Sequence, residues 1–550
     1  MKFSDVLDQI INKIICKIGR QDSKIFLKIS NLPGERQRLK AHTAFFPSTP
    51  KILLYVNSHQ LRTNAVSSFP VRVRHSAPFR DFRDDSFLFI LHNSSRLYSS
   101  IMFLPTESVL IIILFSISVM PSASSPGERL FLTPMIESGE YDTAQQAARV
   151  LSQGVEGFSG FITVDKTNEA NLFFWMFKPL DKHVNWEKAP VIIWLQGGPG
   201  ASSLYGLFTE IGPFYVSEAI VPIKRKYPWC QKYNLLFIDN PVGAGFSFAT
   251  KGHLYLFLLQ FYRMFPQLAG NQLFLMGQSY AGKFIPELAK YIFDKESTDI
   301  KGNIRIPLEA IAIGNGFIDP YNMMHYSDYM YQLGMIDDNS RTELQVLESE
   351  TRKYIKNRMY SQAADHWDLI MNKILDWSKL KEAYDYVHDT KDSNAWQAYL
   401  DNASTRKLLH VGNQTFHNIN DEVRERMQHD IMRSAKPAIE FLLKNDVCDV
   451  VIYSGQFDVL CAYPLTVNVF RKFEWEHAED YKKAERCYLE MDKNVVAYRK
   501  SAGRFIEILF RGCGHMVPAD CPEVASRFLD VFVNKRKKLK CSKGAQDDED

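Results

Sequence analysis

The sequence predicts an α/β fold in which a mostly parallel central sheet carries helices on both faces and a helical cap insertion. Three observations support this prediction. Uniformly apolar runs recur along the chain, helical patterns lie between them, and the runs end in turns rich in Gly, Asp or Pro. Strands that are apolar throughout are typical of parallel sheets covered on both faces. Functional groups are then expected at the carboxyl ends of the strands.

Six predicted strands follow one another along the chain, each with the turn that ends it. Their segments are 189–208 (APVIIWLQGGPGASSLYGLF), 233–248 (YNLLFIDNPVGAGFSF), 271–279 (NQLFLMGQS), 308–320 (LEAIAIGNGFIDP), 448–460 (CDVVIYSGQFDVL) and 505–518 (FIEILFRGCGHMVP). A predicted helix from Ala281 to about Asp294 follows the third strand, and residues 521–535 form the predicted closing helix. This alternation of strands and helices places the strands in one sheet.

The helical insertion is predicted at about residues 322–445, between the fourth and fifth strands. This part of the chain is charged and has helical periodicity, most clearly in TELQVLESETRKYIKNRMYSQAADHWDLIMNKILDWSKLKEAYDYV. It predicts a helical cap over the sheet rather than an independent domain. The whole fold is expected within residues 125–535, and a charged, solvated tail is expected over 536–550.

The charge of the chain is unevenly distributed. Residues 1–100 contain 16 Lys and Arg against 7 Asp and Glu, whereas the other 450 residues contain 50 against 56. The formal net charge of +3 therefore combines a basic N-terminal part with a mildly acidic body. The body lacks the basic footprint of a nucleic-acid-binding protein, so no nucleic-acid partner is expected. With 46% hydrophobic residues, the chain has the composition of a globular protein with a large core.

A predicted signal peptide occupies residues 102–124, which begin with a methionine. Its apolar run 109–120 (VLIIILFSISVM) is shorter than the ~20 residues that span a bilayer. Small residues follow at Ser122 and Ser124, with the spacing of a signal-peptidase site. A buried core helix or a signal anchor is the alternative. On the signal-peptide interpretation, residues 1–101 form a doubtful N-terminal extension.

Export through the secretory pathway follows from this interpretation, with a secreted or lysosomal location. No stable membrane association is expected after signal cleavage. Asn402 and Asn413 begin glycosylation sequons, which agrees with secretion. The eight cysteines include no CxxC pair, so zinc-ribbon and thioredoxin motifs are absent. Disulfides are expected in an oxidising compartment, but the sequence leaves their pairing and the oligomeric state open.

Ser279 is the candidate nucleophile. It follows Gly277 at the point where the third strand turns into a helix, and such a corner exposes a serine hydroxyl. The corner needs small residues because the chain reverses tightly. The generic G-x-S-x-G pattern is met imperfectly, since Ala281 and only then Gly282 follow. Without catalytic partners, a structural serine at a turn would be the better interpretation.

The partners that a serine nucleophile needs lie at two later strand ends. Asp458 comes just after the fifth strand and His515 just after the sixth. The order Ser, Asp, His is that of α/β-hydrolases, so the sequence predicts a catalytic triad on this fold. Histidine takes the serine proton, while aspartate fixes the imidazole tautomer and stabilises the imidazolium. No metal or other cofactor is expected. Cys513 and Cys521 flank the histidine, and the sequence assigns them no role.

A glycine-rich turn, Gly197-Gly198-Pro199-Gly200, ends the first strand. No GK[ST] follows it and it lacks a GxGxxG pattern, so it does not match a phosphate-binding loop. The alternative is an oxyanion hole, because glycine lets backbone N–H groups approach a developing negative charge. The second N–H would come from Tyr280, the residue after the nucleophile.

Six segments together resemble the serine carboxypeptidases, with the vitellogenic carboxypeptidase-like branch as the closest type. They are WLQGGPGASS, NPVGAGFSF, GQSYAGK, IGNGFIDP, YSGQFDVLCAYPLT and GCGHMVPADCP, and they occur in the family's order between about residues 130 and 535. The resemblance implies an α/β-hydrolase that removes single residues from peptide or protein C-termini through an acyl-enzyme. It implies that the catalytic triad is Ser279, Asp458 and His515. It also implies that the amides of Gly198 and Tyr280 form the oxyanion hole.

The same resemblance implies residues that bind the substrate. Four residues fall where the family binds the terminal carboxylate: Trp194, Gln196, Glu210 and Gln278. Met516 falls at a position that lines the pocket for the departing residue. Two alternatives stay open. One is a catalytically impaired secreted homologue that uses its cleft for binding, and the other is an acyltransferase on the same fold.

The chain departs from the family pattern at the carboxylate site. Gln196 stands in place of the usual asparagine, and Gln278 in place of a glutamate that would share a proton with Glu210. A glutamine amide donates a hydrogen bond at any pH. Glu210 is then the titrating member of the site, expected to ionise near its ordinary pKa of ~4.3. A second departure is a shorter segment around residues 249–255.

Overall fold

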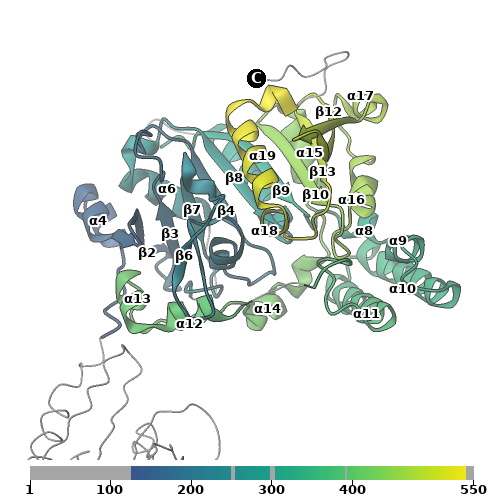
Figure 1. Ribbon diagram of the computed structural model, residues 1–550, viewed down its shortest axis with the longest axis horizontal. Helices are drawn as coiled ribbons and strands as arrows, with labels where there is room; N and C mark the ends of the chain where they lie inside the picture. Colours follow the sequence, from purple (N-terminus) through teal and green to yellow (C-terminus); the bar gives the residue numbers. More distant parts are fainter. Residues whose placement is uncertain (1–124, 249–253, 298–303, 390–392, 540–550) are drawn as a thin grey trace, which may run out of the picture. The chain divides into compact units, whose positions relative to one another are not determined.

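The computed structural model describes residues 125–248, 254–297, 304–389 and 393–539 (Figure 1). The predicted signal peptide and N-terminal extension lie outside these residues, as do most of the charged tail and residues 249–253 of the shortened segment. Within the described ranges, no helix is both long and apolar enough to cross a membrane.

An eleven-stranded sheet forms the centre of the described chain (Figure 1). In chain order its strands are β1 (Arg149–Ser152), β2 (Val155–Asp165), β3 (Ala170–Phe177), β4 (Val191–Leu195), β7 (Asn234–Ile238), β8 (Leu273–Gln278), β9 (Leu308–Gly314), β10 (Asp449–Gly455), β11 (Cys487–Met491), β12 (Asn494–Ala502) and β13 (Phe505–Phe510). Across the sheet they lie in the order β1-β2-β3-β7-β4-β8-β9-β10-β13-β12-β11. A separate hairpin pairs β5 (Phe214–Val216) with β6 (Pro222–Lys224).

The six strands predicted from the sequence form the parallel centre of this sheet. β7, β4, β8, β9, β10 and β13 are neighbours in that order and pair in parallel. The prediction missed the antiparallel flanks, β1–β3 on one side and β12–β11 on the other. β11 and β12 alternate between more and less exposed residues, so they lack the uniformly apolar pattern. β3 is buried along its whole length and carries that pattern, yet it was not predicted.

Two apolar cores lie on opposite faces of the sheet, because successive side chains of a strand point to opposite faces. Along β4, Ile193 and Leu195 enter one core, whereas Ile192 and Trp194 enter the other. Helices α6 (Leu254–Met264), α7 (Ala281–Ser297) and α15 (Lys436–Lys444) contribute to the first core. Helix α19 (Pro522–Asn534) covers the second. Helices therefore cover both faces, as predicted.

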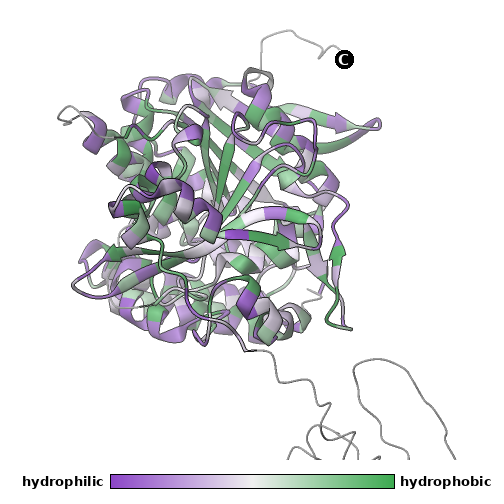
Figure 2. Cartoon of the chain, turned by 90° about the vertical axis from the view of Figure 1, so that its left-hand side faces the viewer, coloured by the Kyte–Doolittle hydropathy of each residue, from purple (hydrophilic) through white to green (hydrophobic). Residues whose placement is uncertain are grey.

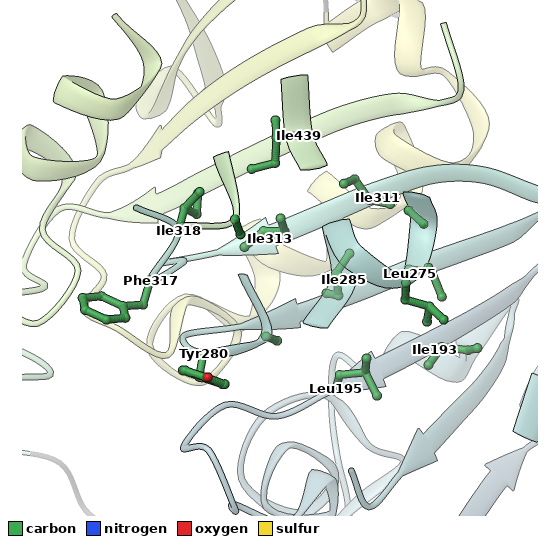
Figure 3. Close-up of a cluster of buried hydrophobic side chains, with 14 of the residues drawn as sticks. Ile193, Leu195, Leu275, Tyr280, Ile285, Ile311, Ile313, Phe317, Ile318 and Ile439 are labelled. Carbon is green, nitrogen blue, oxygen red and sulfur yellow. The ribbon is translucent and has the colours of Figure 1, made fainter. Parts of the chain in front are cut away.

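The first core supports the turn after β8, as Figure 3 shows. Leu275 of β8 and Ile313 of β9 lie on the sheet face that Ile285 of α7 and Ile439 of α15 cover. Burial of a side chain of this size stabilises the fold by ~1.5–3 kcal/mol. This packing holds the strands and helices around the turn in place. Figure 2 shows that the strands inside are apolar, whereas the outer faces of the helices are polar.

The chain between β9 and β10 supplies the helical insertion. Its helices are α8 (Pro320–Met323), α9 (Tyr326–Gln332), α10 (Asp338–Lys356), α11 (Tyr360–Ser378), α12 (Ala395–Asp401), α13 (Ala403–Leu408) and α14 (Asp421–Ile431), before α15 returns to the sheet. Helices α10 and α11 project together beyond one end of the sheet (Figure 1). Isolated bridges, Ala201 with Ile419 and Gly245 with His417, join the stretch before α14 to the turns after β4 and β7. The insertion therefore contacts the carboxyl ends of the strands.

Short helices complete the described chain. The α-helices among them are α3 (Thr133–Glu137), α4 (Tyr141–Ala147), α5 (Ser203–Tyr205), α16 (Tyr463–Phe470), α17 (Ala478–Lys483) and α18 (Val517–Asp520). A π-helix, η2 (Gly206–Ile211), follows α5, and the 3₁₀-helices are η3 (Trp229–Gln231), η4 (Pro266–Leu268) and η5 (Arg536–Leu539). The first residues of the predicted tail thus belong to η5.

Candidate active site

Ser279 lies at the turn between β8 and α7, where the sequence predicts it. Its φ of +61° is in the left-handed region, as expected for a tight strand–turn–helix corner. The Ser279 N–H donates to the carbonyl of Gly314 (3.0 Å), and the Ser279 carbonyl accepts from the N–H of Phe317 (3.0 Å). The last residue of β9 and the turn after it therefore hold the serine from both sides.

Two glycines make room for this corner. A Cβ on Gly277 would lie 2.2 Å from the carbonyl oxygen of Leu195. A Cβ on Gly282 would lie 3.2 Å from Cα of Gly316. Ala281, where the generic pattern has glycine, is fully buried in the first core. Neighbouring atoms approach the backbone closely at residues 277 and 282, whereas residue 281 has room for the methyl group of Ala281. This explains why the chain matches the G-x-S-x-G pattern imperfectly.

Asp458 and His515 meet where the chain leaves β10 and β13. His515 Nδ1 lies 2.8 Å from Asp458 Oδ2, and the two side chains are 3% and 0% exposed. With Nδ1–H donating to the carboxylate, Nε2 is left as the proton acceptor. His515 Nε2 is buried and makes no hydrogen bond within the described part of the chain. The pair therefore has the geometry of a general base that a carboxylate orients.

Asp458 has further partners that the sequence analysis missed. Its Oδ2 also accepts from Asn315 Nδ2 (2.7 Å) and from the N–H of Cys461 (3.2 Å). Asn315 directly follows Gly314, whose carbonyl accepts from the N–H of Ser279. Ser279 and Asp458 are thus connected through two adjacent residues, Gly314 and Asn315. An asparagine in the turn after a buried strand was the available signal.

Asp458, Cys461 and His515 also place three atoms of metal-ligand type within 4.8 Å of one another. Asp458 and His515 already share a hydrogen bond, between Oδ2 and Nδ1. Burial, with a contribution from the charge of Asp458, raises the pKa of the Cys461 thiol well above its usual value. The thiol is therefore protonated, whereas a metal binds the thiolate. An acid–base pair beside a neutral thiol fits this arrangement better than a metal centre does.

The helical insertion contacts both His515 and the residue after the nucleophile. The Tyr384 ring stacks on the imidazole of His515, with centroids 5.2 Å apart and planes at 29°. The carbonyl of Tyr384 accepts from the N–H of His515 (2.7 Å). The hydroxyl of Tyr280 donates to Asp430 Oδ2 on α14 (2.6 Å). The insertion thereby helps to position the site, and these contacts were not predicted.

A disulfide between Cys513 and Cys521 closes the chain around His515. The two cysteines without a role in the sequence analysis are therefore partners. Within this loop, the N–H of Gly514 donates to Asp520 Oδ2 (2.8 Å). The loop that carries the histidine is thus joined to the residue that precedes α19 by a covalent bond as well as by hydrogen bonds.

The glycine-rich turn after β4 lies against the Ser279 corner. A Cβ on Gly197 would lie 2.6 Å from Ser279 Cβ and 2.8 Å from Tyr280 N, so this approach requires glycine. Gly198 has φ +107°, in the region that glycine favours. The N–H groups of Gly198 and Tyr280 donate to no other residue that the structure describes. Both amides are thus available to a developing negative charge.

The predicted carboxylate-binding residues form one buried hydrogen-bonded chain. Trp194 Nε1 donates to Gln196 Oε1 (2.8 Å), and Gln196 Nε2 donates to Glu210 Oε1 (3.5 Å). Gln278 Nε2 donates to the same Glu210 oxygen (2.6 Å). Glu210 Oε2 and Gln278 Oε1 are buried and have no partner among the described residues. Met516, which is 7% exposed, lies beside His515 at the start of α18.

The expectation that Glu210 ionises near its ordinary pKa is wrong. The pKa of Glu210 is raised from 4.5 to about 8, chiefly by burial and also by the charge of Asp520. Hydrogen bonds from Gln196 and Gln278 and the charge of Arg225 oppose the increase only in part. The sequence shows that the second carboxylate is missing, but it does not show that Glu210 is 1% exposed in the core. At neutral pH the carboxyl is therefore protonated.

Comparison with known protein families gives a direct match. The family model described as serine carboxypeptidase matches residues 151–535. The chain is 38% identical to the venom serine carboxypeptidase of Apis mellifera, over 74% of this chain and 92% of that protein. It is 35% identical to the vitellogenic carboxypeptidase of Aedes aegypti (74% and 90%) and 33% identical to the probable serine carboxypeptidase CPVL of Homo sapiens (75% and 91%).

A solved structure has the same fold. The chain resembles Kex1Δp, a prohormone-processing carboxypeptidase from Saccharomyces cerevisiae, with a TM-score of 0.61 and 20% sequence identity. The match covers 71% of this chain and 96% of that one. The predicted α/β-hydrolase fold is therefore confirmed.

Proposed function

Because the chain belongs to the serine carboxypeptidase family, we propose that Ser279, Asp458 and His515 are the catalytic triad of this enzyme. The protein is a serine-type carboxypeptidase, a hydrolase that releases single residues from peptide C-termini. One observation carries the assignment of the triad. It is the buried 2.8 Å hydrogen bond between His515 and Asp458, joined through Asn315 and Gly314 to the Ser279 turn.

The reaction proceeds through an acyl-enzyme. His515 Nε2 removes the proton as Ser279 Oγ attacks the last peptide carbonyl, and Asp458 stabilises the imidazolium that forms. The N–H groups of Gly198 and Tyr280 donate to the developing oxyanion. His515 then protonates the amino group of the leaving residue. A water molecule, deprotonated by the same nitrogen, hydrolyses the ester and restores the Ser279 hydroxyl.

The substrate's terminal carboxylate binds at Gln196, Glu210 and Gln278. A protonated Glu210 is neutral, so it does not repel the incoming carboxylate. It can donate from one oxygen while the other accepts from Gln278 Nε2. The raised pKa of Glu210 thereby supplies a neutral donor without the second acidic residue of the usual pair. Trp194 contributes indirectly by fixing the amide of Gln196.

The test uses the native protein and its Ser279→Ala variant with a fluorophosphonate probe and a blocked dipeptide that has a free C-terminus. The native protein is expected to label and to release one amino acid. Ser279→Ala is expected to fold with an unchanged melting temperature and to lose at least about a hundredfold in kcat, because triad losses typically reach ~10⁴. Peptide binding without labelling or hydrolysis would support a binding protein instead. Transfer to an added alcohol in preference to water would support an acyltransferase.

We also propose that the protein is secreted or delivered to lysosomes, with peptide or protein C-termini as its substrates. The Cys513–Cys521 disulfide supports an oxidising compartment, since such bonds are rare in the cytosol. Asn402 and Asn413, which begin the two sequons, are exposed and therefore accessible to glycosylation. One relative carries the name of a venom enzyme.

A further inference from the structure

We propose that Asn315 is a positioning residue that couples the nucleophile turn to the acid–base pair. The proposal rests on the triad proposed above. It assigns Asn315 the task of holding Asp458 so that its Oδ2 faces His515. Asn315 lies in the turn that follows β9, between the strands that carry the nucleophile and the acid.

The backbone around Asn315 fixes the position of Ser279. The carbonyl of Gly314 and the N–H of Phe317 bond to the two peptide groups of Ser279, each at 3.0 Å. The N–H of Asn315 donates to the carbonyl of Tyr453 on β10 (2.7 Å). The segment from 314 to 317 is therefore tied to β8 through Ser279 and to β10 through Tyr453. A shift of this segment would move the nucleophile and the acid together.

The side chain of Asn315 has only one consistent orientation. Its Oδ1 accepts from the N–H of Gly455 (3.1 Å), which requires an oxygen at that place. The amide nitrogen must then face Asp458, where Nδ2 donates to Oδ2 at 2.7 Å. Asn315 is fully buried, so no solvent replaces this donor. Its loss would leave a buried carboxylate with one hydrogen bond fewer, which is costly in the interior.

The hydrogen bonds of Asp458 explain why this donor matters for catalysis. Oδ2 accepts from His515 Nδ1, Asn315 Nδ2 and the N–H of Cys461, whereas Oδ1 is buried with no partner among the described residues. Asn315 thus keeps the carboxylate turned toward the histidine. If the carboxylate rotates, the imidazole loses the bond that fixes its tautomer and orientation.

A second explanation for Asn315 must be separated from this one. Its φ of +44° lies in the left-handed region, which asparagine adopts more easily than most residues. Asn315→Gly keeps this backbone conformation accessible but removes the amide. Asn315→Asp keeps the size of the side chain but replaces the donor with a carboxylate oxygen. Asp492→Gly is the matched control, because Asp492 has φ +50° in the exposed turn between β11 and β12.

The experiment measures kcat, KM, the rate of fluorophosphonate labelling and the NMR signal of the His515 Nδ1 proton. For Asn315→Gly and Asn315→Asp, we expect an unchanged KM, a decrease of at least about tenfold in kcat and in labelling rate, and a shifted or missing proton signal. Asp492→Gly should match the native protein in all four. Circular dichroism establishes that each variant is folded.

Two results would overturn the proposal. Native kcat and labelling rate in Asn315→Gly would show that residue 315 serves only the backbone conformation. A lower kcat with an unchanged proton signal would show that Asn315 does not act through Asp458 and His515. Failure of the triad itself has a different signature, since Ser279→Ala would then keep its activity whatever the Asn315 variants do.

Discussion

Glu210 is a carboxyl group in the core, with two glutamine amides as hydrogen-bond partners. Its pKa of about 8 means that the site stays neutral over the acid and neutral range. The effect of Gln278 is therefore more than the removal of one ionisable group. The Gln278 amide donates to Glu210, which burial keeps protonated. Recognition of the substrate's terminal carboxylate is therefore expected to be insensitive to pH up to about 8.

Gln278→Glu tests this conclusion. In the native protein, KM for a blocked dipeptide is expected to stay nearly constant from pH 5 to 7 and to rise as Glu210 ionises at about pH 8. In Gln278→Glu, two carboxylates share the site and ionise in separate steps, the first at lower pH. KM should then already rise between pH 5 and 7. Gln278→Asn is the neutral control, and parallel profiles for all three proteins would contradict contact between residue 278 and the substrate carboxylate.

Glu210→Gln tests the pKa through stability. The folded-state pKa lies above the unfolded value, so the stabilising contribution of the neutral carboxyl is complete below pH 4.5 and is lost as pH rises through about 8. In that window this group lowers the free energy of unfolding by about 1.4 kcal/mol per pH unit. Glu210→Gln is expected to show a shallower decline in chemical denaturation from pH 5 to 8. Glu218→Gln, at an exposed glutamate, should leave the native slope unchanged.

At the scale of elements, the proposed catalytic residues lie in the turns after the strands, and the helices hold those turns in place. The turn after β13 has a covalent restraint, because the Cys513–Cys521 disulfide joins it to the start of α19. The loop it closes contains His515 and Met516. A restraint on this loop is therefore expected to act on the proposed catalytic base as well as on stability.

Removal of the disulfide measures its contribution. The double variant Cys513→Ser and Cys521→Ser is expected to lower the free energy of unfolding by about 2–3 kcal/mol, the chain-entropy value for a short loop. It should also lower kcat, since the His515 loop becomes less restrained. Cys448→Ala, which changes a buried free thiol away from the site, is the control for cysteine replacement. An unchanged kcat in the double variant would limit the disulfide to a structural role.

The sequence predicted the candidate site residues that directly follow a predicted strand. It did not predict the contacts that other segments of the chain make with them. Ser279, Asp458 and His515 each follow a recognisable apolar strand. Tyr384 reaches His515 from the insertion, whose path over the sheet has no local sequence signal. The pKa of Glu210 depends on the complete burial of its side chain. The sequence around this glutamate, which lies in a π-helix, does not show that it is buried. Local patterns therefore predicted the candidate residues but not the contacts and the burial that surround them.

At the scale of the whole molecule, one sheet brings together residues from distant parts of the chain. β8, β9, β10 and β13 are adjacent in the sheet, although the insertion separates β9 from β10 in sequence. The residues that match the family model, 151–535, include all four of these strands.

The predicted signal peptide concerns the whole molecule, because it determines where the exported protein begins. Exported protein is expected to begin near Ser124 or Ser125, because small residues at positions 122 and 124 suit signal peptidase. N-terminal sequencing of material from the culture medium measures this directly. Replacement of Ser122 and Ser124 by lysine should block the cleavage and reduce export. Intact residues 1–101 on exported protein would contradict the signal-peptide interpretation.

The position of β13 in the sheet has a consequence for biosynthesis. A ribosome translates the nucleophile at Ser279 long before it reaches β13, the last strand in chain order that the structure describes. β13 must then pair with β10 before His515 can meet Asp458. A nascent chain that has not passed this strand holds a serine without its base. With the proposed triad, proteolytic competence is therefore expected only after β13 has been translated and has paired with β10.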